Sequence, residues 1–449
     1  GGYAVDNSVR LDGSSSYMTK SMGTPTNIDK YSFSFWVKRS KLGVQQSIFR
    51  STNGAASNDS HVTFQADDTL RFEEYGGSAS IGKLQTTQVF RDISAWYSIL
   101  LVYDSGNGTA GNRMRMYVNG TEVTAFGTDN NPSQNADSFF NKSGETLSFG
   151  RTPYSGGGNY FSGYVAELVM CDGQALTPTD IGEFDEDSGI WKPIDVSGLT
   201  FGTNGFYLDF EDSANLGNDA NGGTDLTESG LAAIDQSTDT CTNNFATLNS
   251  LDTHPSATLS EGNLKIATTA GGWHGSSTTI GITLGQSLYF EAKAVSSARL
   301  YFGLSRIGQG VRGTARNNVA EGDSNWDYMW RTTTANTVYY GGSNQSITIG
   351  AISANDICAC RVNTDGQVIF YKNDSVVVTF STTLVAGYFY FPILSANAFG
   401  GGTESWLANF GSPAYAISSS NTDPDGYGNF EFETKSAYAL NTKNLAEYG

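Results

Sequence analysis

Short segments with alternating apolar and polar residues recur along the chain and constrain its fold more than any other feature. In residues 31–38 (YSFSFWVK), aromatic or aliphatic side chains occupy every second position, as on one face of a β-strand. Asn119-Gly120, and Asn373-Asp374 after Tyr371-Lys372, have the residue types of tight hairpin turns. Further strands bounded by turn-forming residues are predicted at 47–50, 62–66, 69–75, 96–103, 113–118, 146–149, 206–210, 288–295, 299–304, 337–340, 356–362, 368–372 and 375–380. Many short strands separated by turns predict an all-β fold of antiparallel sandwiches.

The stretch Tyr160–Trp191 predicts a central strand and a capped helical turn. Residues 164–171 are mostly apolar at both alternating positions, which is typical of a strand covered on both faces. Asp172-Gly173 then turns the chain, and residues 177–180 (TPTD) combine an N-cap, a first-turn proline and an acidic third residue. We interpret this stretch as the closing element of a first folded unit.

Changes along the chain in the alternation of apolar residues and in the share of turn-forming residues predict two jelly-roll sandwiches in series. The first spans residues 1–195 and the second spans 246–415, with a β-containing connector at 196–245. Residues 416–449 lose the alternation, so we expect an irregular tail that is either disordered or laid along a partner.

Composition excludes several classes of partner. The chain has 449 residues, 45 acids and 26 bases, giving a formal charge of −19, which opposes binding to nucleic acid or anionic membranes.

We find no apolar run near the roughly 20 residues of a membrane span. The four cysteines are too few for a disulfide framework, so we expect buried small apolar residues. Because the chain begins with Gly, we expect that a segment precedes it.

Several segments of the sequence resemble known protein families. The strand at 33–38, the hairpin at Asn119-Gly120 and AELVMCDGQALTPTDIGEF with GIWKP resemble laminin-G/concanavalin-A-like lectin domains. That last phrase, and GTNGFYLDFEDSANLGNDANGGTDLT after it, are similar to parts of structural proteins of tailed, particularly marine, bacteriophages. YFEAKA, DICACRVNTDGQVIFYKND, YFYFPILSANA and WLANFG resemble a SPRY domain. The resemblance implies a virion appendage that binds carbohydrate or protein.

The concanavalin-A-like resemblance raises the question of glycoside hydrolysis. Glucanases of this fold carry Glu-x-Asp-x-Glu on one strand, and two carboxyl groups must flank the scissile bond. The nearest string here, residues 183–187 (EFDED), ends in Asp and follows the predicted helical turn instead of lying on a strand. We therefore expect a solvated acidic loop and no catalytic residues.

Two kinds of binding site remain as candidates. Oxygen ligands suited to Ca²⁺ cluster in the connector, although such residues also make ordinary turns. These weak metal candidates are Asp209, Glu211, Asp212 and Asp219. Aromatic residues among Gly, Asn and Asp could stack on sugar rings or meet a receptor. The candidates for this contact surface are Tyr154, Tyr160, Trp273, His274, Trp326, Tyr328 and Trp330, whereas Trp36, Trp96 and Trp406 are expected to be buried.

Three functions compete. The first is a non-enzymatic phage tail or head fibre subunit that binds host-surface glycans or a receptor. The second is a capsid or tail decoration protein that binds neighbouring subunits, and the third is a secreted polysaccharide-active enzyme. We favour the fibre subunit, located on the virion and bound to other virion proteins. By analogy with fibre proteins we expect a homo-oligomer, in the simplest case a trimer. No cofactor is expected other than a Ca²⁺ ion at the candidate ligands.

Overall fold

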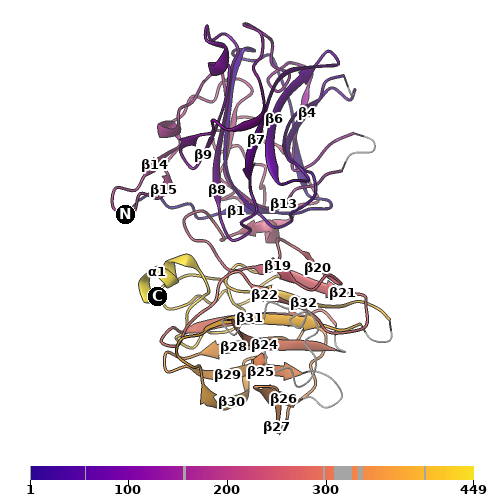
Figure 1. Cartoon of the computed structure of the whole chain (residues 1–449), viewed down its shortest axis with the longest axis vertical. Coiled ribbons are helices and arrows are strands. Elements are labelled where there is room, and N and C mark those ends of the chain that lie inside the picture. Colours follow the sequence, from indigo (N-terminus) through magenta and orange to yellow (C-terminus); the bar gives the residue numbers. More distant parts are fainter. Residues whose placement is uncertain are drawn as a thin grey trace. The chain divides into compact units, whose positions relative to one another are not determined.

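The chain folds into two compact units, Gly1–Thr242 and Asn243–Gly449 (Figure 1). The computed structural model describes residues 2–55, 57–154, 158–296, 299–307, 326–331, 337–398 and 401–449. All strand pairs among these residues are antiparallel, which confirms the predicted all-β class. No helix among them is long and apolar enough to cross a membrane.

The first unit is a sandwich of two sheets, named sheet A and sheet B here. Sheet A runs in the order β10-β9-β8-β3-β13-β1-β18, with β16 also paired to β13. Its strands are β10 Thr121–Glu122, β9 Met114–Val118, β8 Tyr97–Asp104, β3 Lys30–Arg39, β13 Ser162–Asp172, β1 Ser8–Asp12, β18 Gln236–Ser237 and β16 Phe206–Leu208. Sheet B runs in the order β11-β7-β6-β5-β4-β12-β2-β17. Its strands are β11 Phe126–Asn130, β7 Ala79–Val89, β6 Thr69–Gly76, β5 Ser60–Phe64, β4 Gln46–Thr52, β12 Thr146–Phe149, β2 Tyr17–Ser21 and β17 Thr227–Ser229.

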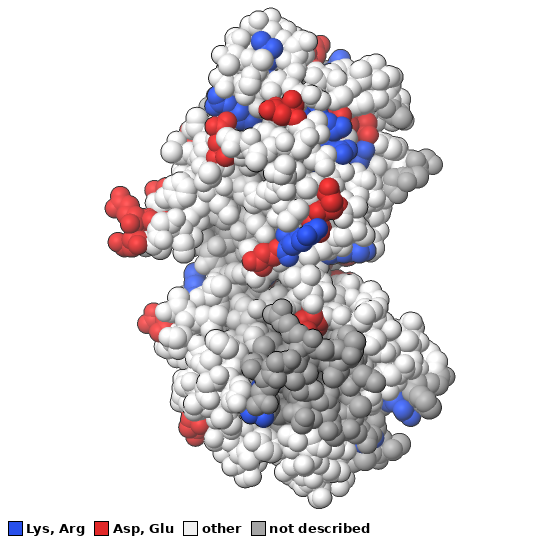
Figure 2. Space-filling view, in the orientation of Figure 1, with Lys and Arg blue, Asp and Glu red and all other residues white. Residues whose placement is uncertain are grey.

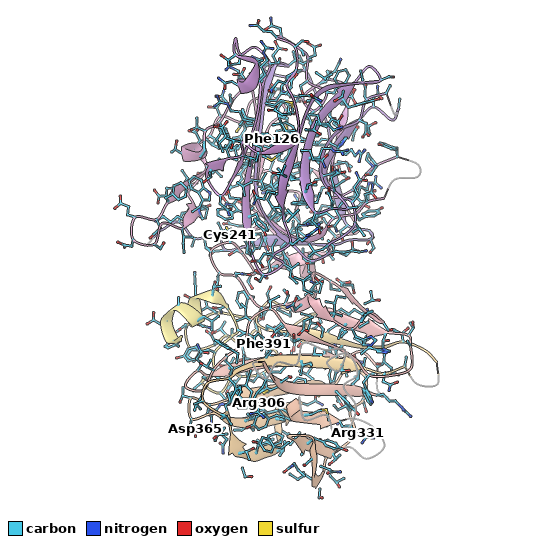
Figure 3. All side chains as sticks on the ribbon, in the orientation of Figure 1. Phe126, Cys241, Arg306, Arg331, Asp365 and Phe391 are labelled. Atoms are coloured by element: carbon cyan, nitrogen blue, oxygen red, sulfur yellow. The ribbon has the colours of Figure 1, made fainter. Side chains whose placement is uncertain are left out.

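Alternate residues of these strands fill the space between sheets A and B. Phe33 of β3 stacks on Phe49 of β4 with ring centroids 4.4 Å apart, and both side chains are fully buried. Phe126, labelled in Figure 3, packs against this core from β11. The period-2 pattern therefore places the aromatic residues where the sequence predicted an apolar face.

Both predicted hairpin turns are present. Asn119 and Gly120 join β9 to β10 with φ of 48° and 76°. Asn373 and Asp374 join β29 (Gln367–Lys372) to β30 (Ser375–Thr383) with φ of 46° and 68°. Positive φ at both central residues matches the twist of antiparallel strands, and Asn, Asp and Gly adopt it most readily.

The outer face of sheet A is covered by other parts of the first unit. Strand β13 is buried along its whole length, as the apolar residues on both its faces predicted. Val5, Leu176, Trp191 and Phe201, from segments outside sheet A, pack against this outer face. The predicted helical turn is a single 3-10 turn, Pro178–Asp180, and it leads to a small hairpin of β14 (Gly182–Phe184) and β15 (Trp191–Pro193).

The predicted connector at 196–245 is part of the first unit instead of a separate link. Strand β16 pairs with β13, β17 pairs with β2, and β18 pairs with β1. Phe206 and Leu208 of β16 belong to the core between the sheets, because this short segment alternates apolar residues as a core strand does. The boundary between the units follows Thr242.

The second unit is also a two-sheet sandwich, of sheets C and D. Sheet C runs in the order β19-β22-β31-β24-β25-β26-β27 and sheet D in the order β20-β21-β32-β23-β28-β29-β30. The strands of sheet C are β19 Leu248–Thr253, β22 His274–Thr278, β31 Phe389–Ala396, β24 Leu300–Ile307, β25 Trp326–Arg331, β26 Thr337–Tyr340 and β27 Ser343–Thr348. The other strands of sheet D are β20 Ala257–Ser260, β21 Lys265–Thr268, β32 Glu404–Asn409, β23 Leu288–Ala294 and β28 Ile357–Val362.

Cys358 and Cys360 point side by side into the core as free thiols, and Cys171 is buried as expected, whereas Cys241 is partly exposed.

The predicted C-terminal tail is packed against the second unit itself. Phe430, Ala437 and Ala439 are buried against Tyr289 and Tyr371 on the outer face of sheet D. The chain ends in a short helix, α1 Thr442–Tyr448, with Asn441 as its N-cap. The segment lacks alternation because it covers a sheet instead of joining one.

Candidate ligand-binding face

Polar side chains line the outer face of sheet B, and Ser148, Arg50, His61 and Glu73 among them are buried. One row crosses all eight strands through directly paired positions. The row consists of Thr227, Thr19, Ser148, Arg50, His61, Glu73, Lys83 and Asn130. We call this row, together with Tyr17, Asp59, Arg151, Tyr154 and Tyr160 beside it, the polar face.

Arg50 is the centre of a hydrogen-bonded network on the polar face. Its guanidinium makes a bidentate ion pair with the Asp59 carboxylate, with Nη2 at 2.6 Å from Oδ2. Nη2 also donates to the Tyr154 hydroxyl at 2.9 Å, and Nη1 donates to the Thr152 hydroxyl at 3.1 Å. The ion pair raises the pKa of Arg50 despite its burial. This network fixes the Tyr154 ring against the sheet and leaves Arg50 with little freedom.

Tyr17, Arg151 and Tyr160 form an aromatic cluster near the network. The Arg151 guanidinium lies 3.4 Å from the centroid of the Tyr17 ring, and the Tyr17 and Tyr160 ring centroids are 6.4 Å apart. All three side chains are partly exposed. A partly exposed tyrosine ring beside a guanidinium can stack on the apolar side of a sugar ring while nearby donors bind hydroxyl groups.

Three buried polar atoms on the polar face make no hydrogen bond to any described residue: Ser148 Oγ, His61 Nε2 and Arg151 Nε. Ser148 Oγ lies between Thr19 and Arg50 in the row, and Ser148 is fully buried. His61 Nε2 is the second and lies 3.4 Å from a Glu73 carboxylate oxygen, and Arg151 Nε is the third. Burial and the charge of Arg50 lower the pKa of His61 to about 4, so the imidazole is neutral at pH 7. Because Nδ1 lies 2.8 Å from the Asp59 carbonyl oxygen, the proton belongs on Nδ1 and Nε2 is an acceptor.

The acidic string at 183–187 lies outside the polar face. Glu183 sits on the β14–β15 hairpin, where Lys192 Nζ is 3.3 Å from its carboxylate and 3.2 Å from that of Asp185. Phe184 is about half exposed beside it. Figure 2 shows acidic side chains at the edge of the molecule where Figure 1 places this hairpin. The two carboxylates are solvated and paired with one lysine, so the string does not form the buried acid that glycoside hydrolysis needs.

Only part of the predicted aromatic surface lies at accessible positions. Tyr154 and Tyr160 are partly exposed on the polar face, as proposed for a contact surface. Trp273 is partly exposed in the second unit and stacks on Tyr301 at 3.4 Å between ring centroids. His274 is buried beside it, with Nδ1 2.8 Å from the Thr268 hydroxyl.

The prediction of a contact surface at Tyr328 and Trp330 is wrong. Both side chains are almost fully buried in the core between sheets C and D, because alternate residues of β25 face that core. The Trp326 side chain lies outside the described residues. Trp36, Trp96 and Trp406 are buried, which confirms the prediction for these three.

The metal candidates of the predicted connector form turns. Asp209 and Asp212 each accept a hydrogen bond from the backbone N–H two residues ahead. Asp219 accepts from the backbone N–H groups of Tyr207 and Asn221, and Glu211 is exposed. Within the described residues, no three His, Cys, Asp or Glu side chains are grouped to hold a metal ion.

Sequence reasoning did not find Tyr17, Arg50, His61 and Arg151. The signal was present in part, because Arg50 and His61 occupy the polar positions of strands whose other positions are core residues. Their meeting in one row depends on the pairing register of strands that are far apart in the sequence, which the local pattern does not contain.

Comparison with known proteins agrees with the architecture of the first unit. Residues 12–182 match the concanavalin A-like lectin/glucanases superfamily. Over these residues the first unit is therefore similar to concanavalin A-like lectin/glucanase domains, and its antiparallel two-sheet sandwich agrees with that similarity. No curated protein matches the chain significantly by sequence.

Solved structures resemble parts of the chain. The SPRY domain of human HERC1 is 14% identical, with a TM-score of 0.30 over 36% of this chain and 96% of that one. The heptameric SAP-like pentraxin of Limulus polyphemus is 18% identical, with a TM-score of 0.30 over 39% and 79%. A Bacteroides ovatus protein described as carbohydrate-binding is 16% identical, with a TM-score of 0.35 over 50% and 58%.

Proposed function

We propose that this chain is a non-catalytic carbohydrate-binding protein whose polar face holds the ligand. The observation that carries the proposal is the combination, on one sheet of the sandwich, of partly exposed tyrosine rings with a partly exposed guanidinium beside them. Sugars present an apolar ring face and a rim of hydroxyl groups. Tyr17 and Tyr160 suit the ring face, whereas the partly exposed Arg151 guanidinium beside Tyr17 suits the hydroxyl groups.

The rigidity of the polar face supports binding. Asp59 holds Arg50 and also accepts a hydrogen bond from the Tyr154 hydroxyl at 2.5 Å, so these polar groups are ordered before a ligand arrives. A preformed site loses less conformational entropy on binding than a mobile one.

We extend the proposal to adhesion on a virion. The resemblance of the GIWKP phrase and the segment after it to phage structural proteins is its support. In this setting the chain is an appendage subunit, binds other virion proteins, assembles as a homo-oligomer and recognises host-surface polysaccharide. Negative-stain imaging of particles labelled with antibody against the chain would locate it, and absence from the particles would reject the virion assignment alone.

The double variant Tyr17→Ala/Tyr160→Ala is expected to lose affinity by roughly 5- to 150-fold. Each ring contributes about 0.5–1.5 kcal/mol through stacking, and about 1.4 kcal/mol corresponds to one factor of ten in Kd. A glycan array would identify a ligand, and isothermal titration calorimetry would compare affinities. Phe184→Ala is the control, since it removes a half-exposed aromatic ring from the β14–β15 hairpin of the same unit. Equal affinity of the double variant and the control would reject the polar face as the site.

Incubation with a bound polysaccharide is expected to release no reducing ends. The Glu183→Gln variant should behave identically, because its carboxylate is solvated and lies away from the polar face. A reducing-sugar assay over a range of pH provides the measurement. Release of reducing ends that depends on Glu183 would show that the chain is a glycosidase and would reject the proposal of a non-catalytic binding protein.

A further inference from the structure

The first unit contains a lysine and an aspartate in contact and sealed from solvent. Lys38 lies on β3 and is paired with Tyr164 of β13, and Asp239 lies just beyond β18. Lys38 Nζ is 2.7 Å from Asp239 Oδ2, and each side chain is only 1% exposed. The contact joins residues 201 positions apart in the sequence.

The surroundings of this pair are those of a reaction site for acyl transfer. The Trp96 indole Nε1–H donates to Asp239 Oδ1 at 3.1 Å. The Tyr164 ring centroid is 5.6 Å from Lys38 Nζ, and both aromatic residues belong to the apolar cluster on the outer face of sheet A. An N–H fixed on a carbonyl oxygen stabilises the negative charge that develops there during nucleophilic attack.

Burial also favours the uncharged amine of Lys38. Desolvation lowers the pKa of the Lys38 ammonium, although the neighbouring charges of Asp239 and Asp92 act in the opposite direction. In an apolar site, a proton transferred from lysine to aspartate gives a neutral amine beside a neutral carboxylic acid. These two forms are the reactants of amide formation.

We propose that Lys38 and Asp239 join in an intramolecular isopeptide bond that forms without an enzyme. Lys38 Nζ attacks Asp239 Cγ, and the C–N bond forms while the negative charge moves to Oδ1, where Trp96 donates its hydrogen bond. A proton from the attacking nitrogen passes to Oδ2. The C–Oδ2 bond then breaks, and Oδ2 leaves as water with the two protons it has received. The reaction consumes no oxidant, reductant or further reactant.

The position of the bond explains what it would do. Asp239 lies three residues before Thr242, the last residue of the first unit, and β18 pairs with β1 over only two residue positions. Tension on the chain at the end of the unit would otherwise fall on that short pairing. A covalent link to β3, in the middle of sheet A, would carry the tension into the sandwich instead.

Mass spectrometry of the denatured wild-type chain tests the proposal directly. The expected intact mass is lower than the sequence mass by one water molecule. Digestion with trypsin and a glutamate-specific protease should yield residues 31–39 covalently joined to residues 229–261, with no cleavage after Lys38. The Lys38→Gln variant should have its full sequence mass, whether or not it folds.

Arg10 and Asp235 provide an internal control. They form another buried ion pair in the same unit, with Nη2 at 3.2 Å from Oδ1, but a guanidinium stays protonated and is not a nucleophile. Peptides containing Arg10 should therefore be linear. A wild-type chain of full sequence mass with linear Lys38 and Asp239 peptides overturns the proposal and leaves an ordinary buried ion pair.

Discussion

Replacing Glu291 with alanine is expected to free residues 416–449 from sheet D and to lower the free energy of unfolding of the second unit. The Glu291 carboxylate is fully buried and accepts five hydrogen bonds. Two donors are the backbone N–H groups of Glu431 and Phe432, at 3.1 and 2.9 Å. The other donors are the side chains of Tyr289, Asn409 and Tyr415.

The size of the effect follows from the donors that the variant would leave without an acceptor. An unsatisfied buried polar group costs about 1–3 kcal/mol, so losing the acceptor of two backbone and three side-chain donors should cost about 3 kcal/mol or more. Water entering beside the released segment relieves part of this cost. The loss should therefore appear mainly as local opening of residues 416–449.

Hydrogen exchange measured by mass spectrometry should show lost protection at residues 416–449 in Glu291→Ala. Glu433→Ala is the matched control, because Glu433 lies in the same segment and is exposed. Undiminished protection in Glu291→Ala would mean that apolar contacts such as Phe430 on Tyr289, with ring centroids 5.2 Å apart, hold the segment without the carboxylate.

The same segment shows which parts of the fold the sequence can and cannot predict. Strands and hairpins such as Asn119-Gly120 are local, so period and turn chemistry predict them. The C-terminal segment is held by Glu291, which comes from a strand about 140 residues earlier. Two of its backbone N–H groups, those of Glu431 and Phe432, bind this side chain, and the segment adds no regular strand to the sheet, so it has no periodic pattern. Residues 206–208 were placed in a connector because a short strand contains no sign of the sheet that it joins.

The residues of the candidate site also fall into two groups: those that the local sequence predicts and those that only the structure reveals. Tyr154 and Tyr160 were predicted from local composition, since rings among Gly and Asn favour an exposed loop. Trp330 and Tyr328 were misplaced by the same rule, although their alternation with Asp327 and Met329 is typical of a strand with an aromatic inner face. His61 and Arg50 are adjacent only because of strand register. Their role therefore required the structure.

The Glu167→Gln variant is expected to be more stable than the wild-type chain at pH 8 and equally stable at pH 4. Glu167 is only 5% exposed at the irregular part of β13, where its φ is 49°. Its carboxylate accepts from the Tyr207 hydroxyl at 3.0 Å and from the Tyr3 hydroxyl at 3.3 Å. Burial outweighs these hydrogen bonds and, with the charges of Asp209 and Asp195, raises the pKa of Glu167 from 4.5 to about 7.

The sign of the pH dependence follows from which state binds the proton more tightly. The folded pKa is above the unfolded one, so the folded state holds the proton more strongly between these two values. The stabilisation is complete below about pH 4.5 and is lost as the pH rises through about 7. One pKa unit corresponds to about 1.36 kcal/mol, so ionising Glu167 in the folded state costs about 3 kcal/mol at pH 8. Glutamine is never charged and avoids this cost while retaining an acceptor for Tyr207.

Urea unfolding of the two proteins at pH 4, 6 and 8 measures the effect on the first unit. The difference in the free energy of unfolding should grow from near zero to about 3 kcal/mol in favour of Glu167→Gln. Glu186→Gln removes the charge of an exposed glutamate of the β14–β15 hairpin and should show no such growth. A difference that is the same at all three pH values would show that Glu167 does not change its protonation in this range. The tyrosine hydrogen bonds would then be strong enough to keep the buried carboxylate ionised.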